Sequence, residues 1–155
     1  MCMGMAVASA EIRTSRDDFS GKSLVISEIL NVGRLNRVEL FKHFDPVRPS
    51  GIILFIKCQS TNPPYFENRS ADMKIDNNVY SLDCIDSTSW LNIDNTVSTQ
   101  ISFEVSDLIA NKIIGSNNVT VRVYLNGNGA YETFDVTPDM LNEWKQIVVK
   151  DKAVL

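Results

Sequence analysis

The chain has 155 residues, of which 44% are hydrophobic and 22% are charged, and its formal net charge is −4. This length and composition predict one soluble globular domain without a transmembrane segment, because no apolar run approaches the roughly 20 residues of a spanning helix. The acidic balance and the lack of a clustered Lys/Arg stripe exclude a binder of the nucleic-acid backbone.

The first ten residues, Met1–Ala10, are uncharged, mostly apolar and end in Ala8-Ser9-Ala10. Small residues at the last and third-last positions fit a signal peptidase, so we interpret residues 1–10 as the remnant of a secretory signal. One globular domain then covers residues 11–155, and the protein is secreted or periplasmic. The alternative is a disordered, Ala/Met-rich N-terminus retained on a cytosolic protein.

The first half of the domain predicts strands. Glu11–Arg16 alternates and is expected at a sheet edge, and Lys22–Ile29 is rich in β-branched residues. Arg37–Phe44 alternates less cleanly and fits either a strand or a one-turn helix. Ile52–Cys58 is the most apolar run of the chain, which predicts a central strand covered on both faces.

The second half predicts hairpins. Asp76-Asn77-Asn78 and Asn126-Gly127-Asn128-Gly129 supply residues that tolerate the left-handed backbone of a tight turn. The expected strands are Met73–Ile75, Val79–Cys84, Trp90–Ile93, Ser98–Val105, Val119–Leu125 and Tyr131–Val136. Ser98–Val105 alternates most clearly, and its odd-numbered apolar residues are expected to point inward.

Two helices are expected, and their starts resemble each other. Ser106 and Thr137 are natural N-caps, and each follows an aromatic residue, an acid and a valine. The first helix, Asp107–Ile114, ends at Gly115, and the second, Pro138–Val149, carries a stripe of apolar residues at helical spacing. In that stripe Leu141, Trp144 and Ile147 are expected to face the sheet, while Glu143 and Lys145 stay in solvent.

The predicted fold is mostly β: an antiparallel β-sandwich or curled sheet with one short helix and a C-terminal amphipathic helix. An α+β alternative has two strand–strand–helix units, residues 72–114 and 119–149. The two units would reflect an internal duplication. The competing interpretation is that helix starts resemble each other because they use the same capping chemistry.

Two cysteines, Cys58 and Cys84, remain if Cys2 leaves with a signal peptide. In an oxidising compartment they could form a disulfide. The alternative, which the sequence favours, is that both are small apolar residues buried in strands.

The acidic stretch from Asp72 to Asp107 holds seven acids against one base, Lys74. Three of these acids, Asp83, Asp86 and Asp94, are candidate calcium ligands, although the EF-hand spacing is absent. The favoured interpretation is that Asp and Asn mark turns between strands, with no cofactor. His43 is the only histidine, which excludes sites of two or three histidine ligands and favours a half-buried structural role.

Three aromatic residues in or near expected loops, Tyr65, Phe66 and Trp90, are candidates for contact with a protein or a glycan. The sequence therefore predicts an exported, non-enzymatic, β-rich binding or envelope module with no recognisable catalytic residue. Two alternatives remain open. One is a small hydrolase that uses carboxylates of the Asp72–Asp94 region, and the other is a cytosolic protein-interaction domain.

Overall fold

The computed structural model describes residues 11–60, 66–125 and 130–151, and within them it contains nine strands and two helices. The strands are β1 (Glu11–Arg16), β2 (Ser23–Val32), β3 (Leu35–Phe44), β4 (Gly51–Ser60), β5 (Phe66–Ile75), β6 (Asn78–Leu91), β7 (Val97–Val105), β8 (Val119–Leu125) and β9 (Ala130–Val136). The helices are α1 (Asp107–Ile114) and α2 (Pro138–Val149). Every strand pairs antiparallel with its neighbours.

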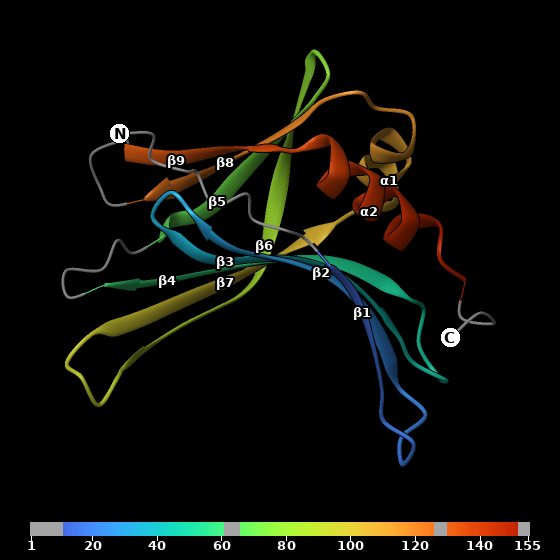
Figure 1. Ribbon diagram of the computed structural model, residues 1–155, viewed down its shortest axis with the longest axis horizontal. Coiled ribbons are helices and arrows are strands. Elements are labelled where there is room, and N and C mark those ends of the chain that lie inside the picture. Colours follow the sequence, from blue (N-terminus) through green and yellow to red (C-terminus); the bar gives the residue numbers. More distant parts are fainter. Residues whose placement is uncertain (1–10, 61–65, 126–129, 152–155) are drawn as a thin grey trace, which may run out of the picture.

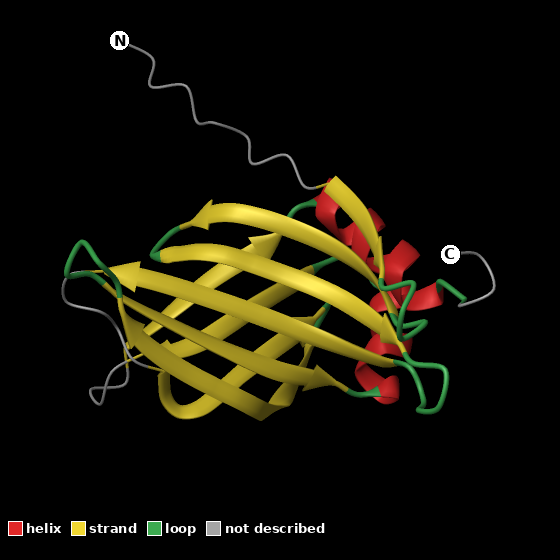
Figure 2. Cartoon of the chain, turned by 90° about the horizontal axis from the view of Figure 1, so that it is seen from below, coloured by secondary structure: helices red, strands yellow, loops and turns green. Residues whose placement is uncertain are grey.

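All nine strands belong to one curled sheet, with the order β1-β2-β3-β4-β7-β6-β5-β8-β9. Figure 2 shows the sheet wrapped around its own interior, with both helices at one end. The fold predicted from the sequence is therefore confirmed in its curled-sheet form. The edge position expected for Glu11–Arg16 is also confirmed, and Arg37–Phe44 is part of a strand rather than a helix.

The inner face of the sheet holds the core. On β7, Ile101, Phe103 and Val105 are buried while Glu104 is exposed, so the predicted alternation is confirmed. On β4, Leu54 and Ile56 are fully buried. The outward-facing Phe55 of the same strand is only half-buried and lies outside the core cluster, so the expected cover on both faces of β4 is wrong.

Both helices begin as expected. The hydroxyls of Ser106 and Thr137 accept hydrogen bonds from the backbone N–H groups of Ile109 and Met140, which would otherwise lack a partner in the first turn. The two caps have nearly the same backbone angles, φ −61° and −62° with ψ 159° in both. Each helix follows the second strand of a hairpin, β6–β7 or β8–β9.

Helix α2 fills the interior with its apolar stripe. Leu141, Trp144 and Ile147 are buried as predicted, and Trp144 is fully buried. Helix α2 contacts β2 and β3 of the sheet and also contacts α1. Neither helix among the described residues has the length and hydrophobicity that crossing a bilayer requires.

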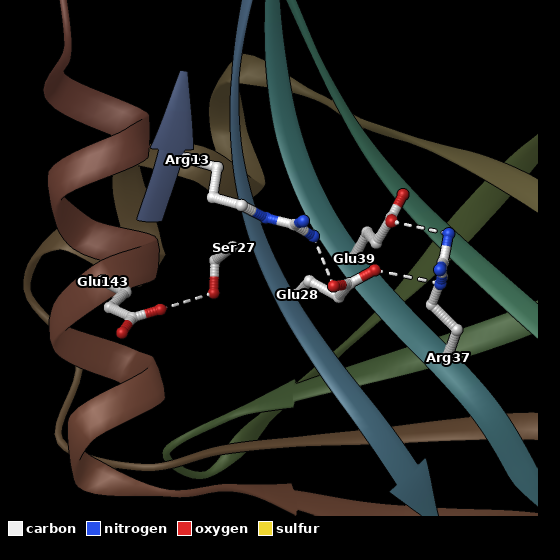
Figure 3. Close-up of polar contacts among 6 residues, drawn as sticks. All are labelled: Arg13, Ser27, Glu28, Arg37, Glu39 and Glu143. Carbon is white, nitrogen blue, oxygen red and sulfur yellow. Dashed lines mark hydrogen bonds and ion pairs between the residues drawn. The ribbon is translucent and has the colours of Figure 1, made fainter. Parts of the chain in front are cut away.

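Polar contacts fix α2 at three places, two of which contradict the sequence prediction. Glu143 accepts a 2.7 Å hydrogen bond from the buried Ser27 hydroxyl, as Figure 3 shows. Lys145 Nζ donates to the Ser116 backbone oxygen at 2.6 Å. Both side chains are half-buried, so the expectation that they stay in solvent is wrong. The helical pattern showed which face is apolar but not what the flanking residues reach across the interior.

The third contact comes from Lys42 on β3. Its Nζ atom donates to the backbone oxygens of Val148 and Lys150, at 2.7 and 2.9 Å. The last turn of α2 has no basic residue of its own, so Lys42 supplies the positive charge that a helix C-terminus favours. Burial lowers the pKa of Lys42 from its ordinary value.

Candidate functional site

A pair of carboxylates lies on the outer face of the sheet. Glu28 on β2 and Glu39 on β3 are direct cross-strand partners, and each side chain is only 14% exposed. Arg37 bridges them, with Nε 2.9 Å from Glu28 Oε2 and Nη1 3.4 Å from Glu39 Oε1. Arg13 on β1 pairs with the other oxygen of Glu28 (Figure 3).

Glu39 retains a proton more strongly than an isolated glutamate does. Burial raises the pKa of Glu39, and a hydrogen bond with Glu28 raises it further. Two arginines nevertheless balance the two acids, and both carboxylates already have partners within the cluster. The arrangement therefore fixes the register of β1, β2 and β3 and leaves no charge available for a ligand.

The acids of the Asp72–Asp94 region are spread over the sheet. Asp72 accepts hydrogen bonds from Tyr124 Oη at 2.6 Å and Ser81 Oγ at 3.0 Å. Asp76, which has a left-handed backbone (φ 51°), accepts from the N–H groups of Asn117 and Asn118, both at 3.0 Å. These two acids organise turns and strand pairs, which is the interpretation that the sequence favours.

The three candidate calcium ligands do not come together. Asp83 and Asp86 lie on β6, whereas Asp94 lies in the turn after it and accepts from the backbone N–H and the hydroxyl of Thr96. These hydrogen bonds, chiefly that from the hydroxyl, lower the pKa of Asp94. No group of three His, Cys, Asp or Glu side chains among the described residues has a geometry that could hold a metal ion.

Cys58 and Cys84 are free thiols. Cys58 on β4 pairs with Thr99 of β7, and Cys84 on β6 pairs with Phe103 of β7, so β7 lies between them. Two strand spacings of about 4.8 Å, together with the offset of four residues between Thr99 and Phe103 along β7, separate their backbones by more than roughly 10 Å, beyond the reach of a disulfide. The possible disulfide is therefore not formed. Cys58 is buried as expected, whereas Cys84 is only half-buried. Burial raises the pKa of the Cys58 thiol to about 11.

His43 is half-buried, as the sequence predicts. It faces Gly51 across β3 and β4, and a Cβ atom at position 51 would stand 2.5 Å from His43 Nε2. Glycine at position 51 therefore makes room for the imidazole. The ring also borders an open cavity of about 460 Å³ together with Asp45 and Arg48. A neighbouring cavity of about 340 Å³ is lined by Lys42, but the Lys42 amino group already holds α2.

Of the three aromatic candidates, the structure describes the side chain of one. Tyr65 and the side chain of Phe66 lie outside the described residues. Trp90 lies near the end of β6, is 37% exposed and packs its ring against Lys57 Nζ, 5.2 Å from the ring centroid. Leu91 and Ile93, which follow it at the hairpin tip, are more exposed still, at 69% and 106%.

Strand β6 is longer than the sequence predicts. The predicted strand Val79–Cys84 and the first two residues of the predicted strand Trp90–Ile93 belong to one 14-residue strand, with an irregularity between Cys84 and Asp86. Asn92 and Ile93 lie in the turn that follows, so the predicted end of the second strand is wrong. Its first part, Asn78–Leu82, pairs with β5, and its second part pairs with β7 (Figure 1). Strand β6 thereby joins the two halves of the sheet.

The second part of β6 has an open edge. Beyond Leu82, β5 no longer pairs with β6, and among the described residues β7 is its sole strand partner from Asp86 to Leu91. All residues of Ile85–Leu91 are exposed except Ser87, which is half-buried. Both faces and one edge of this segment are therefore accessible.

The turn at the hairpin tip shows which backbone groups face the open edge. Asn92 N–H donates to the Thr96 backbone oxygen, and Asn95 has a left-handed backbone (φ 61°). Hydrogen-bonded and non-hydrogen-bonded pairs alternate in an antiparallel ladder, so Thr88 and Trp90 bond to β7. The N–H and C=O groups of Ser87, Ser89 and Leu91 therefore point to the open side. The sequence suggested only Trp90 here, since the run Ser87-Thr88-Ser89 has no apolar alternation.

Comparison with known proteins identifies no relative. No family model matches the chain, and no curated protein or solved structure matches it. Proposals about its function therefore rest on the geometry of the chain itself.

Proposed function

We propose that this protein is a non-enzymatic, exported binding module that receives an extended segment of a partner protein as an added strand on the open edge of β6. One observation carries the proposal: Asp86–Leu91 pairs with β7 alone and is exposed, apart from the half-buried Ser87. Unpaired N–H and C=O groups along a strand are a ready template for a further strand.

The composition of this edge supports binding rather than protection. Natural proteins commonly block a free edge with charged residues, above all lysine, with proline, with a β-bulge or with a covering loop. Ile85–Leu91 contains no lysine, arginine or proline, and its one charge and the bulge lie at its start, at Asp86. Trp90 and Leu91 add exposed apolar surface at its end. An added strand would gain backbone hydrogen bonds along the edge and apolar contact at the tip, which favours a protein partner over a glycan.

The hydrolase alternative has little support in the geometry, since Asp72 and Asp76 organise a strand pair and a turn through hydrogen bonds within the chain. The export part of the proposal depends on Met1–Ala10, which lie outside the described residues. A cytosolic interaction domain would use the same edge in another compartment.

A single proline substitution on the open edge of β6 tests the proposal. Strand-forming peptides are first selected against the wild-type protein from a random decapeptide library, and their dissociation constants are then measured with variants. Because the Ser89 N–H faces the open side, Ser89→Pro removes one edge donor and leaves the β7 hydrogen bonds in place. We expect the selected peptides to bind this variant at least about tenfold more weakly, the equivalent of 1.4 kcal/mol.

Ser89→Ala is the matched control, because both substitutions remove the hydroxyl that donates to Thr99 Oγ1 at 3.1 Å. We expect the alanine variant to bind like the wild type. Equal binding of the selected peptides to the proline variant and the wild type would show that the edge of β6 is not their site.

A further inference from the structure

Four acids and no basic residue lie between Asn78 and Val105, the segment that forms β6, the hairpin turn and β7. Three of the acids are exposed on the outer face of this hairpin: Asp83, Asp86 and Glu104. Asp83 and Glu104 are direct cross-strand partners, and Asp86 pairs with Ser102 on the same face. Among the described residues none of these three side chains forms an ion pair or a hydrogen bond.

Like charges directly opposite each other on a sheet are destabilising. Elsewhere on the outer face, the repulsion between the cross-strand partners Glu28 and Glu39 is offset within the chain, because they form ion pairs with Arg13 and Arg37. Strands β6 and β7 contain no lysine or arginine of their own, and among the described side chains none pairs with these acids. A cation brought by a strand on the open edge would lie beside Asp83 and Asp86 and would relieve this repulsion.

We infer that the partner segment is basic, with Lys or Arg at the alternate positions that face Asp83 and Asp86. This inference rests on the proposed function, because it assigns the charge of the strand that β6 receives. The other face of the same segment carries Cys84, Ser87 and Ser89, which pair with the inward-facing Phe103, Ile101 and Thr99 of β7. Cys84 packs against the core, so apolar side chains of the partner on this face would adjoin the apolar interior. An extended segment that alternates basic and apolar residues fits both faces.

The same charges make a second copy of this chain a poor occupant. Pairing of two β6 edges would bring Asp83 and Asp86 of both copies onto one pairing surface, where their negative charges repel. Self-association through this edge is therefore disfavoured, while a segment of opposite charge is attracted. The acidic face thus sets which partner the open edge accepts.

Three decapeptides test the inference: alternating Lys and Val, alternating Gln and Val, and alternating Glu and Val. We expect the Lys peptide to bind the wild-type protein most tightly and the Glu peptide least. Asp86→Asn should raise the dissociation constant of the Lys peptide about fivefold and leave that of the Gln peptide unchanged. Asp139→Asn makes the same charge change on an exposed residue of α2 and is the control; it should leave both dissociation constants unchanged.

The outcomes separate the two proposals. If the peptides bind equally well and Ser89→Pro abolishes their binding, the edge is a binding site but the inferred charge preference is wrong. If the Lys peptide binds Ser89→Pro as well as the wild type, the charges attract it without strand addition, and the proposed function is wrong. If none of the three binds while the library-selected peptides bind the wild type and lose binding to Ser89→Pro, the inferred charge preference is wrong and the proposed function stands.

Discussion

Replacing Trp144 with alanine is expected to lower the free energy of unfolding by about 3–5 kcal/mol. Trp144 is fully buried on the inner face of α2 and is the largest side chain that is completely enclosed. Its removal loses the transfer free energy of the indole and leaves a cavity between the helix and the sheet. This loss is a large part of the roughly 5–15 kcal/mol that stabilises an ordinary domain, so chemical denaturation will measure it easily.

Two further variants sharpen this test. Gln146→Ala changes an exposed residue on the same helix and should change stability by less than about 0.5 kcal/mol. Trp144→Phe keeps an aromatic ring and removes the indole N–H, which is buried and has no hydrogen-bond partner among the described residues. We therefore expect Trp144→Phe to be clearly more stable than Trp144→Ala. A Trp144→Ala protein of wild-type stability would show that α2 does not fill the core as described.

Replacing Glu143 with alanine is expected to cost about 1–3 kcal/mol, far more than an exposed helix position would. The Ser27 hydroxyl is completely buried and donates to Glu143 Oε2, so its loss leaves a buried donor without an acceptor. Ser27→Ala removes the donor itself, while the half-buried Glu143 can still reach water. We therefore expect Ser27→Ala to be the milder of the two substitutions.

A double-mutant cycle between these residues isolates their interaction. Once Ser27 is alanine, the further change Glu143→Ala should cost much less than it does in the wild-type protein. If Glu143→Ala alone changes the free energy of unfolding by less than about 0.5 kcal/mol, the contact between α2 and β2 does not contribute to stability.

Local patterns in the sequence predicted most of the individual elements. Strand alternation placed Ile101 and Phe103 in the core, and hydroxyl residues before acidic first turns located both helix starts. These signals succeed because they depend on neighbours within about four residues. The capping hydrogen bonds of Ser106 and Thr137 are made within their own first turns.

Pairing between distant segments could not be predicted in the same way. Strand β4 lies beside β7 rather than β5, and no short-range pattern encodes that choice. The contact of Glu143 with Ser27 joins residues 116 positions apart, so helical spacing alone wrongly assigned Glu143 to solvent. The single strand Asn78–Leu91 was divided in the prediction because Asp86–Ser89 contains no apolar residue.

The candidate binding edge was only partly visible in the sequence. Trp90 was singled out as an aromatic residue for partner contact, and the structure places it on the open strand. The edge is open because β5 stops pairing with β6 after Leu82 while β7 continues to pair with it. This depends on how β5, β6 and β7 pair with one another, which no short stretch of sequence reveals. The acidity of the region was evident, but only the register places Asp83 opposite Glu104.

Amide hydrogen exchange of β6 in the free protein tests the open edge most directly. The N–H groups of Thr88 and Trp90 bond to β7 and should be protected, whereas those of Ser87, Ser89 and Leu91 should exchange rapidly. Adding the alternating Lys–Val peptide should slow exchange at Ser87, Ser89 and Leu91 and leave the other two amides nearly unchanged. Protection of all five amides in the free protein would show that the edge is already covered and would contradict the proposed function.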